Sequence, residues 1–125
     1  MNAKRKRTAE CLQIFVPEGD RESKSIPVDL HDRWVVQLLE LCALLFGGAT
    51  AYGRGVGVWR EKGTVHWDRV TVVEAWVDPR LRTLGRRLRE LEQRLEEMRA
   101  DLRQVAVGYI LKGKKRFLFG GACRP

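Results

Sequence analysis

Two strand-like runs joined by a short turn place the strongest constraint on the fold of this chain. Residues 49–59 and 64–77 flank Arg60-Glu61-Lys62-Gly63, and a glycine-containing connection between two such runs is typical of a β-hairpin. Alternate residues of a strand share a face. The second run therefore places two sets of side chains on opposite faces. One set is Val65, Trp67, Thr71, Val73, Ala75 and Val77, and the other is His66, Asp68, Val70, Val72, Glu74 and Trp76.

The segments around this hairpin predict an α+β fold. Residues 11–16 form an apolar run stopped by a proline, residues 29–46 show helical spacing, a leucine helix follows Pro79, and residues 104–111 alternate again. The order strand, helix, strand, strand, helix, strand is that of a ferredoxin-like βαββαβ domain. We therefore expect a four-stranded antiparallel sheet with both helices on one face, the first and third strands being central. Residues 117–119 could add a short further strand.

The second helix is predicted to be longer than the sheet requires. Leucine or methionine recurs at alternating spacings of three and four from Leu81 to Leu102, which is a heptad pattern. A helix over residues 79–103 would be roughly 37 Å long at 1.5 Å per residue. The heptad could be only the core stripe of a helix packed on the sheet. The length of the helix nevertheless favours contact of its far turns with a second copy of the chain, as a homodimer, or with a subunit of a larger complex. The residues predicted for this interface are Leu88, Leu91, Leu95, Met98 and Leu102.

The positive charge is concentrated at the two ends of the chain. The net charge is +8, but ten of the 24 basic residues lie in residues 1–7 and 102–125, which leaves the rest of the chain close to neutral. We therefore divide the chain into a flexible basic arm (1–9), a domain (10–111) and a basic, aromatic C-terminal extension (112–125). Clustered cations of this kind bind nucleic-acid phosphates, although solvated tails are an equally simple interpretation. The residues predicted to contact DNA or RNA are Lys4, Arg5, Lys6, Arg7, Lys112, Lys114, Lys115 and Arg116.

Several classes of protein are disfavoured by the sequence. No apolar run approaches the roughly 20 residues of a membrane helix, and no apolar stretch of signal-peptide length follows the basic start. The expected location is therefore cytoplasmic, without a membrane partner. Cys11, Cys42 and Cys123 are far apart and lack zinc-site spacing. Although His66, Asp68 and Glu74 share a strand face, we predict neither a metal site nor a cofactor.

The segment from Phe46 to Trp59 carries a resemblance to known proteins. Its pattern Phe-Gly-Gly-x-Thr, followed by Gly-x-Gly-x-Trp and a return strand ending at Glu74, resembles a set of small uncharacterised prokaryotic proteins. A related pattern occurs in a family of putative bacterial lipoproteins of unknown function. The matching residues are Phe46, Gly47, Gly48, Thr50, Gly55, Gly57, Trp59, Val72, Val73 and Glu74. The resemblance implies a ferredoxin-like fold and no established activity.

The same glycine-rich segment allows two interpretations. Gly53, Gly55 and Gly57 would share one strand face, where bare backbone permits close approach of a ligand or of another part of the chain. As a ligand pocket it would involve Thr50, Tyr52, Arg54, Trp59 and His66. The leading prediction is nevertheless a non-enzymatic binding or accessory protein whose basic ends contact nucleic acid or an acidic partner. The alternatives are a small enzyme with a pocket at this hairpin and a purely structural interaction subunit.

Overall fold

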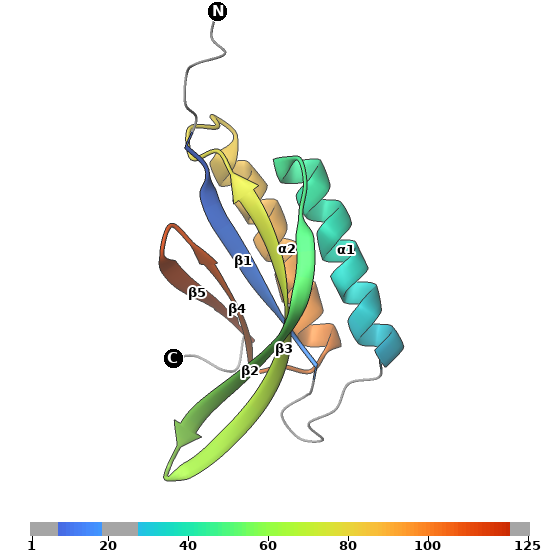
Figure 1. The fold of residues 1–125 in the computed structure, drawn as a ribbon, viewed down its shortest axis with the longest axis vertical. Coiled ribbons are helices and arrows are strands. Elements are labelled where there is room, and N and C mark those ends of the chain that lie inside the picture. The colour runs from blue at the N-terminus through green and yellow to red at the C-terminus, as the bar shows by residue number, and fades with distance from the viewer. Residues whose placement is uncertain (1–7, 19–27, 121–125) are drawn as a thin grey trace, which may run out of the picture.

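The computed structural model describes residues 8–18 and 28–120, which form a five-stranded antiparallel sheet and two helices. In chain order the elements are β1 (Glu10–Pro17), α1 (Val28–Phe46), β2 (Thr50–Glu61), β3 (Thr64–Val77), α2 (Leu84–Asp101), β4 (Ala106–Leu111) and β5 (Lys114–Phe119). The strand order is β2-β3-β1-β4-β5 (Figure 1). The predicted α+β class and antiparallel sheet are confirmed. The prediction of a four-stranded ferredoxin-like sheet is wrong, because a fifth strand extends the sheet beyond β4.

The fifth strand forms because the basic turn after β4 is a tight hairpin turn. Lys112 and Gly113 both have positive φ, at 56° and 72°. This is the backbone of a two-residue type I′ turn, whose twist matches that of the flanking strands. β5 then pairs with β4 along its whole length, from Leu111 opposite Lys114 to Ala106 opposite Phe119. Residues 114–119 of the predicted C-terminal extension are therefore part of the sheet.

The hydrophobic core lies on the face of the sheet that both helices cover (Figure 1). Leu12, Ile14 and Val16 of β1 are fully buried there. They pack with alternate residues of β3 and β4 and with the apolar sides of both helices; the buried partners include Val73, Ala75, Val77, Trp34, Leu38, Leu41, Cys42, Leu45, Val107 and Leu111. We call the opposite side of the sheet, which neither α1 nor α2 covers, the open face. Neither helix is both long and apolar enough to span a membrane, within the residues described.

Helix α2 is shorter than predicted, at 18 residues or about 27 Å. The predicted start at Pro79 is wrong because Asp78 stabilises a turn there. Its Oδ1 accepts a hydrogen bond from the backbone N–H of Arg80 at 2.9 Å, and its carbonyl accepts one from Leu81 at 3.3 Å. The helix therefore begins only at Leu84, after a second turn. Its length matches the sheet that it covers.

The heptad residues of α2 are used inside this chain, which corrects the predicted partner interface. Leu91, Leu95 and Met98 are fully buried, and Leu102 is 2% exposed. Leu88 is partly buried and packs against the same core. A side chain that is already enclosed by its own domain cannot also contact a partner, so these five residues do not form an exposed apolar stripe.

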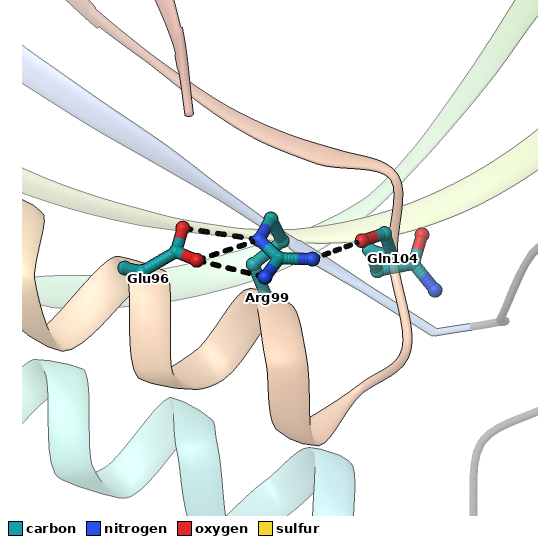
Figure 2. Close-up of polar contacts among 3 residues, drawn as sticks. All are labelled: Glu96, Arg99 and Gln104. Atoms are coloured by element: carbon teal, nitrogen blue, oxygen red, sulfur yellow. Dashed lines mark hydrogen bonds and ion pairs between the residues drawn. The ribbon is translucent and has the colours of Figure 1, made fainter. Parts of the chain in front are cut away.

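The C-terminal end of α2 fixes the loop that leads into β4. Figure 2 shows the guanidinium of Arg99 between Glu96 and Gln104. Nε and Nη2 donate to the Glu96 carboxylate at 2.7–3.0 Å, and Nη1 donates to the carbonyl of Gln104 at 2.9 Å. The hydrogen bonds from Arg99 lower the pKa of Glu96, so the pair is charged at neutral pH. The loop residue Gln104 is therefore held in place relative to the helix.

Candidate functional site

A cluster of polar side chains crosses three neighbouring strands on the open face. The Tyr52 hydroxyl of β2 donates a hydrogen bond to Glu74 Oε2 of β3 at 2.8 Å. The amide of Gln13 on β1 donates to the same carboxylate oxygen and to the Tyr52 hydroxyl, each at 3.1 Å. We call Gln13, Tyr52 and Glu74 the polar cluster. Its members come from sequence positions up to 61 residues apart, and strand pairing brings them together.

A β-bulge places Tyr52 in this cluster. From the turn to Gly55 the pairing is regular, with Glu61 opposite Thr64 and Gly55 opposite Val70. Between Gly55 and Tyr52 the strand β2 contains one extra residue, so that Tyr52 pairs with Val72. Without the extra residue, Tyr52 would lie opposite Val73 on the face that the helices cover, because a shift of one residue moves every side chain to the other face. A Cβ atom on Gly53 would lie 3.2 Å from the backbone of both Thr71 and Val70. Glycine at position 53 therefore lets the bulge pack closely on β3.

The bulge also corrects one prediction about the glycines. Gly55 and Gly57 share the open face with Tyr52, since their partners Val70 and Asp68 lie on that face of β3. Gly53 falls within the bulge and does not continue the same row. The expectation that all three glycines line one face is therefore wrong. Of the three, only Gly55 and Gly57 expose bare backbone on the open face.

The hydrogen bonds of the polar cluster set its charge. Donation from Tyr52 and then from Gln13 lowers the pKa of the Glu74 carboxyl below its ordinary value of 4.5. The same bond to Glu74 raises the pKa of the Tyr52 hydroxyl above 10.0. At neutral pH the cluster therefore presents one carboxylate and one neutral phenol. A carboxylate that is stabilised in this way binds cations well and accepts protons poorly.

Cys11 lies beside the polar cluster on the same face of β1. Burial, followed by a hydrogen bond to Glu74, raises the pKa of its thiol above 9.0. The thiol is thus protonated at neutral pH and is a weak nucleophile. Cys11 therefore lies next to Glu74 and outside the core, whereas Cys42 is fully buried and burial raises its pKa to about 11.

An aromatic hollow of about 850 Å³ lies on the open face. It is next to the polar cluster because its lining residues Phe15 and Val72 are two residues from Gln13 and Glu74 on the same strands. One wall is the far part of the β2–β3 hairpin, which extends beyond the helices in Figure 1, and the other is the β4–β5 hairpin. Phe15 and Val72, which are paired across β1 and β3, form part of its floor. The other lining residues include Pro17, Gly55, Gly57, Trp59, Glu61, His66, Asp68, Val70, Gln104, Gly108, Lys115, Phe117 and Phe119.

Stacked rings form the hairpin wall of the hollow. Trp59 and His66 are paired across β2 and β3, and their ring centroids are 4.2 Å apart with an interplanar angle of 16°. His66 Nε2 lies 3.8 Å from Glu61 Oε1. Nearby, burial raises the pKa of the Asp68 carboxyl. This wall therefore offers flat π-faces together with the carboxyl group of Asp68.

The basic segment after β4 is divided between the two faces by the strand period. Lys115, Phe117 and Phe119 line the hollow. Lys114 and Arg116 alternate with them and point to the other side, opposite Leu111 and Tyr109. Lys112 lies in the hairpin turn. The predicted phosphate-binding cluster is therefore not one continuous basic surface among the residues described, and Lys4, Arg5, Lys6 and Arg7 lie outside them.

The residues predicted for the glycine-hairpin pocket are brought onto or next to one face. Thr50 pairs with Glu74, Trp59 and His66 line the hollow, and Tyr52 lies in the polar cluster. Arg54 is part of the bulge. Within residues 8–18 and 28–120, no three His, Cys, Asp or Glu side chains come close enough to hold a metal ion.

Gln13, Cys11 and Phe15 are the site residues that sequence reasoning missed. They alternate with core residues in a strand that reads as uniformly apolar, so a strand buried on both faces was the simpler interpretation. The available signal was Gln13 itself, a polar residue in the middle of an apolar run. A half-buried amide in an apolar strand favours hydrogen-bond partners, and Glu74 and Tyr52 supply them.

The fold, but not the sequence, is similar to that of known proteins. No family model and no curated protein matches this chain. A solved structure of a phage SAM lyase in complex with S-methyl-5'-thioadenosine has a TM-score of 0.62 at 12% identity, over 96% of each chain. A phage SAM lyase in the apo state has a TM-score of 0.61 at 13% identity, over 90% of each chain. At this identity the likeness establishes the shared fold alone.

This comparison overturns the leading functional prediction. A non-enzymatic accessory protein acting through its basic ends was expected, whereas both solved structures reported above, which match over 90% or more of each chain, are those of an enzyme. The prediction was based on the positive charge at the two ends of the chain and treated the glycine-rich hairpin as the less informative feature. The comparison favours the alternative that was kept beside it, a small enzyme with a pocket at the glycine-rich hairpin.

Proposed function

We propose that this chain is a small enzyme that cleaves S-adenosylmethionine (SAM) and releases S-methyl-5'-thioadenosine. The observation that carries the proposal is the placement of the Glu74 carboxylate beside an aromatic hollow on one sheet face. The shared fold with phage SAM lyase supports the choice of substrate. The polar cluster and the hollow together constitute the proposed active site.

The chemistry of SAM suits these two parts of the site. SAM carries a sulfonium cation next to an adenosine, and an aminobutyrate chain on the other side of the sulfur. Aromatic side chains bind flat bases by stacking and cations through their π-faces, and the Glu74 carboxylate attracts the sulfonium. The hollow, at about 850 Å³, is within the roughly 300–1,000 Å³ typical of small-molecule sites.

The proposed reaction breaks the bond between sulfur and the aminobutyrate chain. The electron pair of that bond stays on sulfur, which yields the neutral thioether S-methyl-5'-thioadenosine. The substrate's own carboxylate oxygen forms the new bond to the carbon released, which closes a five-membered lactone, and no proton is gained or lost. Two opposite charges disappear in this step, so an apolar site of low dielectric constant favours it. Glu74 is a poor base, which supports an orienting role rather than proton abstraction.

The proposal is tested by incubating the purified full-length chain with SAM and separating the products by chromatography. We expect S-methyl-5'-thioadenosine to accumulate faster than in buffer alone. At SAM concentrations well below saturation, Glu74→Gln should reduce the rate by on the order of 100-fold, since it removes the charge that attracts the sulfonium and so weakens SAM binding. Glu40→Gln, an equivalent change at an exposed position on α1, should leave the rate unchanged.

S-adenosylhomocysteine provides the substrate control. It has the same nucleoside and amino-acid parts, but its sulfur is an uncharged thioether and therefore a poor leaving group. We expect no cleavage of it. Release of S-methyl-5'-thioadenosine from SAM at the buffer rate, or an equal rate in Glu74→Gln, would reject the proposed function.

A further inference from the structure

One lysine reaches into the aromatic hollow from the edge of the sheet. The ammonium of Lys115 on β5 lies 4.8 Å from the centroid of the Phe15 ring on β1 and 5.2 Å from that of Phe117. Its side chain therefore lies over β4 and is directed toward the centre of the sheet. Contact with two aromatic faces holds the ammonium at a defined position.

Gly108 makes this crossing possible. It lies in β4, directly between β5 and β1, opposite Phe117. A Cβ atom there would be 3.3 Å from Lys115 Cε and 3.4 Å from Phe117 Cδ1, closer than side chains normally approach. The absence of a side chain at position 108 thus leaves the space that the lysine stem and the phenylalanine ring occupy.

The ammonium of Lys115 has no anionic partner within the described part of this chain. Among the described residues that line the hollow, it is the one lysine or arginine. Within the same described residues no carboxylate pairs with it, and its contacts are the two rings. Lys115 is exposed, so its ammonium, which lies over two rings and is unpaired, is accessible to an anionic group of a ligand bound in the hollow.

Lys115 and the polar cluster belong to one row across the sheet. Lys115 pairs with Ile110, Ile110 with Gln13, and Gln13 with Glu74. The ammonium lies over Phe15 on β1, whereas Glu74 is on the neighbouring strand β3. The two positions therefore differ by one strand spacing, roughly 5 Å, across the sheet and by two residues, roughly 7 Å, along the strands. A cation and a carboxylate are therefore separated by about the length of a small zwitterionic group.

We propose that Lys115 binds the carboxylate of the amino-acid part of the ligand, while Glu74 faces its sulfonium. This inference rests on the proposed function, which supplies a ligand bearing both charges. The pairing would orient the aminobutyrate chain across the row from Glu74 to Lys115. Once the carboxylate has become a neutral lactone, the attraction to Lys115 is lost and product release is favoured.

Two nucleosides that differ in the amino-acid part test this role by binding alone. S-adenosylhomocysteine carries the aminobutyrate carboxylate, and S-methyl-5'-thioadenosine lacks that chain. Calorimetric titration of the full-length chain should show that Lys115→Gln weakens binding of S-adenosylhomocysteine by about tenfold, the value of a charge-assisted hydrogen bond. Binding of S-methyl-5'-thioadenosine should change less than about twofold.

Two further variants complete the design. Lys115→Arg keeps the positive charge and should retain most of the affinity for S-adenosylhomocysteine. Lys114→Gln removes one charge from the adjacent residue, which points to the other face of β5, and should change neither affinity. Equal weakening of both nucleosides by Lys115→Gln would mean that the lysine shapes the hollow, and no weakening would mean that it does not contact the ligand; either result overturns the proposal.

The outcomes separate this proposal from the proposed function. If Lys115→Gln selectively weakens S-adenosylhomocysteine but the wild-type chain does not cleave SAM, the carboxylate contact stands and the lyase activity fails. If SAM is cleaved while both affinities survive Lys115→Gln, the activity stands and the role of Lys115 fails. If neither nucleoside binds to the wild-type chain, both are overturned.

Discussion

The two faces of strand β1 have different surroundings, although alternate residues of one segment form them. Leu12, Ile14 and Val16 are fully buried beneath the helices. Cys11, Gln13 and Phe15 alternate with them on the open face, beside Glu74 and the hollow. The comparison teaches that the helix-covered face supplies stability and leaves the other face of the same strands available for binding.

The two tyrosines of the chain illustrate the same division. Each donates its hydroxyl to a glutamate, Tyr109 to Glu92 at 2.5 Å and Tyr52 to Glu74 at 2.8 Å. Tyr109 is fully buried on the helix side, and burial is the main cause that raises its pKa. Tyr52 is 45% exposed, and its bond to Glu74 is the main cause. Similar pairs therefore serve the core in one place and a ligand-accessible surface in the other.

The largest expected effect is on the free energy of unfolding, which should depend more on the helix-covered face of β1 than on its open face. Ile14→Ala should lower the free energy of unfolding by about 2–5 kcal/mol, because it opens a cavity in a closely packed core. Gln13→Ala, one residue away, should cost less than about 1.5 kcal/mol, since it removes hydrogen bonds at a partly exposed site. Urea denaturation of both variants measures the difference. Equal losses would show that the open face contributes as much to folding as the core does.

An intermediate effect concerns the pH dependence of SAM cleavage. In the proposed reaction Glu74 must be ionised to attract the sulfonium, and its lowered pKa means that activity should be lost only as the pH falls below 4.5. Tyr52→Phe removes the strongest donor to this carboxylate and should raise its pKa, so the acid limb of the profile should move to higher pH. Gln13→Ala should shift it in the same direction by less. An acid limb that stays in place in both variants would contradict the described hydrogen bonding.

The smallest expected effect is on the reactivity of Cys11. Glu74 is one of the groups that raise the pKa of this thiol, so Glu74→Gln should speed its alkylation by iodoacetamide a few-fold at pH 8, as the thiolate fraction increases. Cys42 is fully buried and should react slowly in both forms. Peptide mass spectrometry distinguishes the cysteines. An unchanged rate at Cys11 would place its thiol away from the Glu74 carboxylate.

Much of the architecture could be predicted from sequence periodicity. The β2–β3 hairpin, its turn at Lys62-Gly63 and the division of β3 into two faces follow from alternation and from the glycine, which has a φ of 81°. The helix after residue 78 was predicted with a wrong start, because an acidic residue before proline can stabilise either a helix or a separate turn. The fifth strand was underestimated because its alternating lysines and phenylalanines also read as a basic tail.

The site was harder to predict, because it depends on register. Tyr52 and Glu74 were noted separately, but their contact requires the bulge that shifts pairing between Tyr52 and Gly55. Nothing in the local sequence fixes which residue a strand leaves unpaired. Lys115 was read as a phosphate-binding residue, and its inward path over Gly108 became visible only once β4 and β5 were paired.

The central claim is that the ligand binds to the open face of the sheet. Titration of the isotope-labelled chain with S-methyl-5'-thioadenosine, followed by NMR, tests it most directly. We predict that the largest shift changes occur at Phe15, Trp59 and Phe117, which line the hollow, and that Ile14 and Leu95 in the core change little. Shift changes confined to the helices or the chain ends, or none at millimolar ligand, would contradict the account.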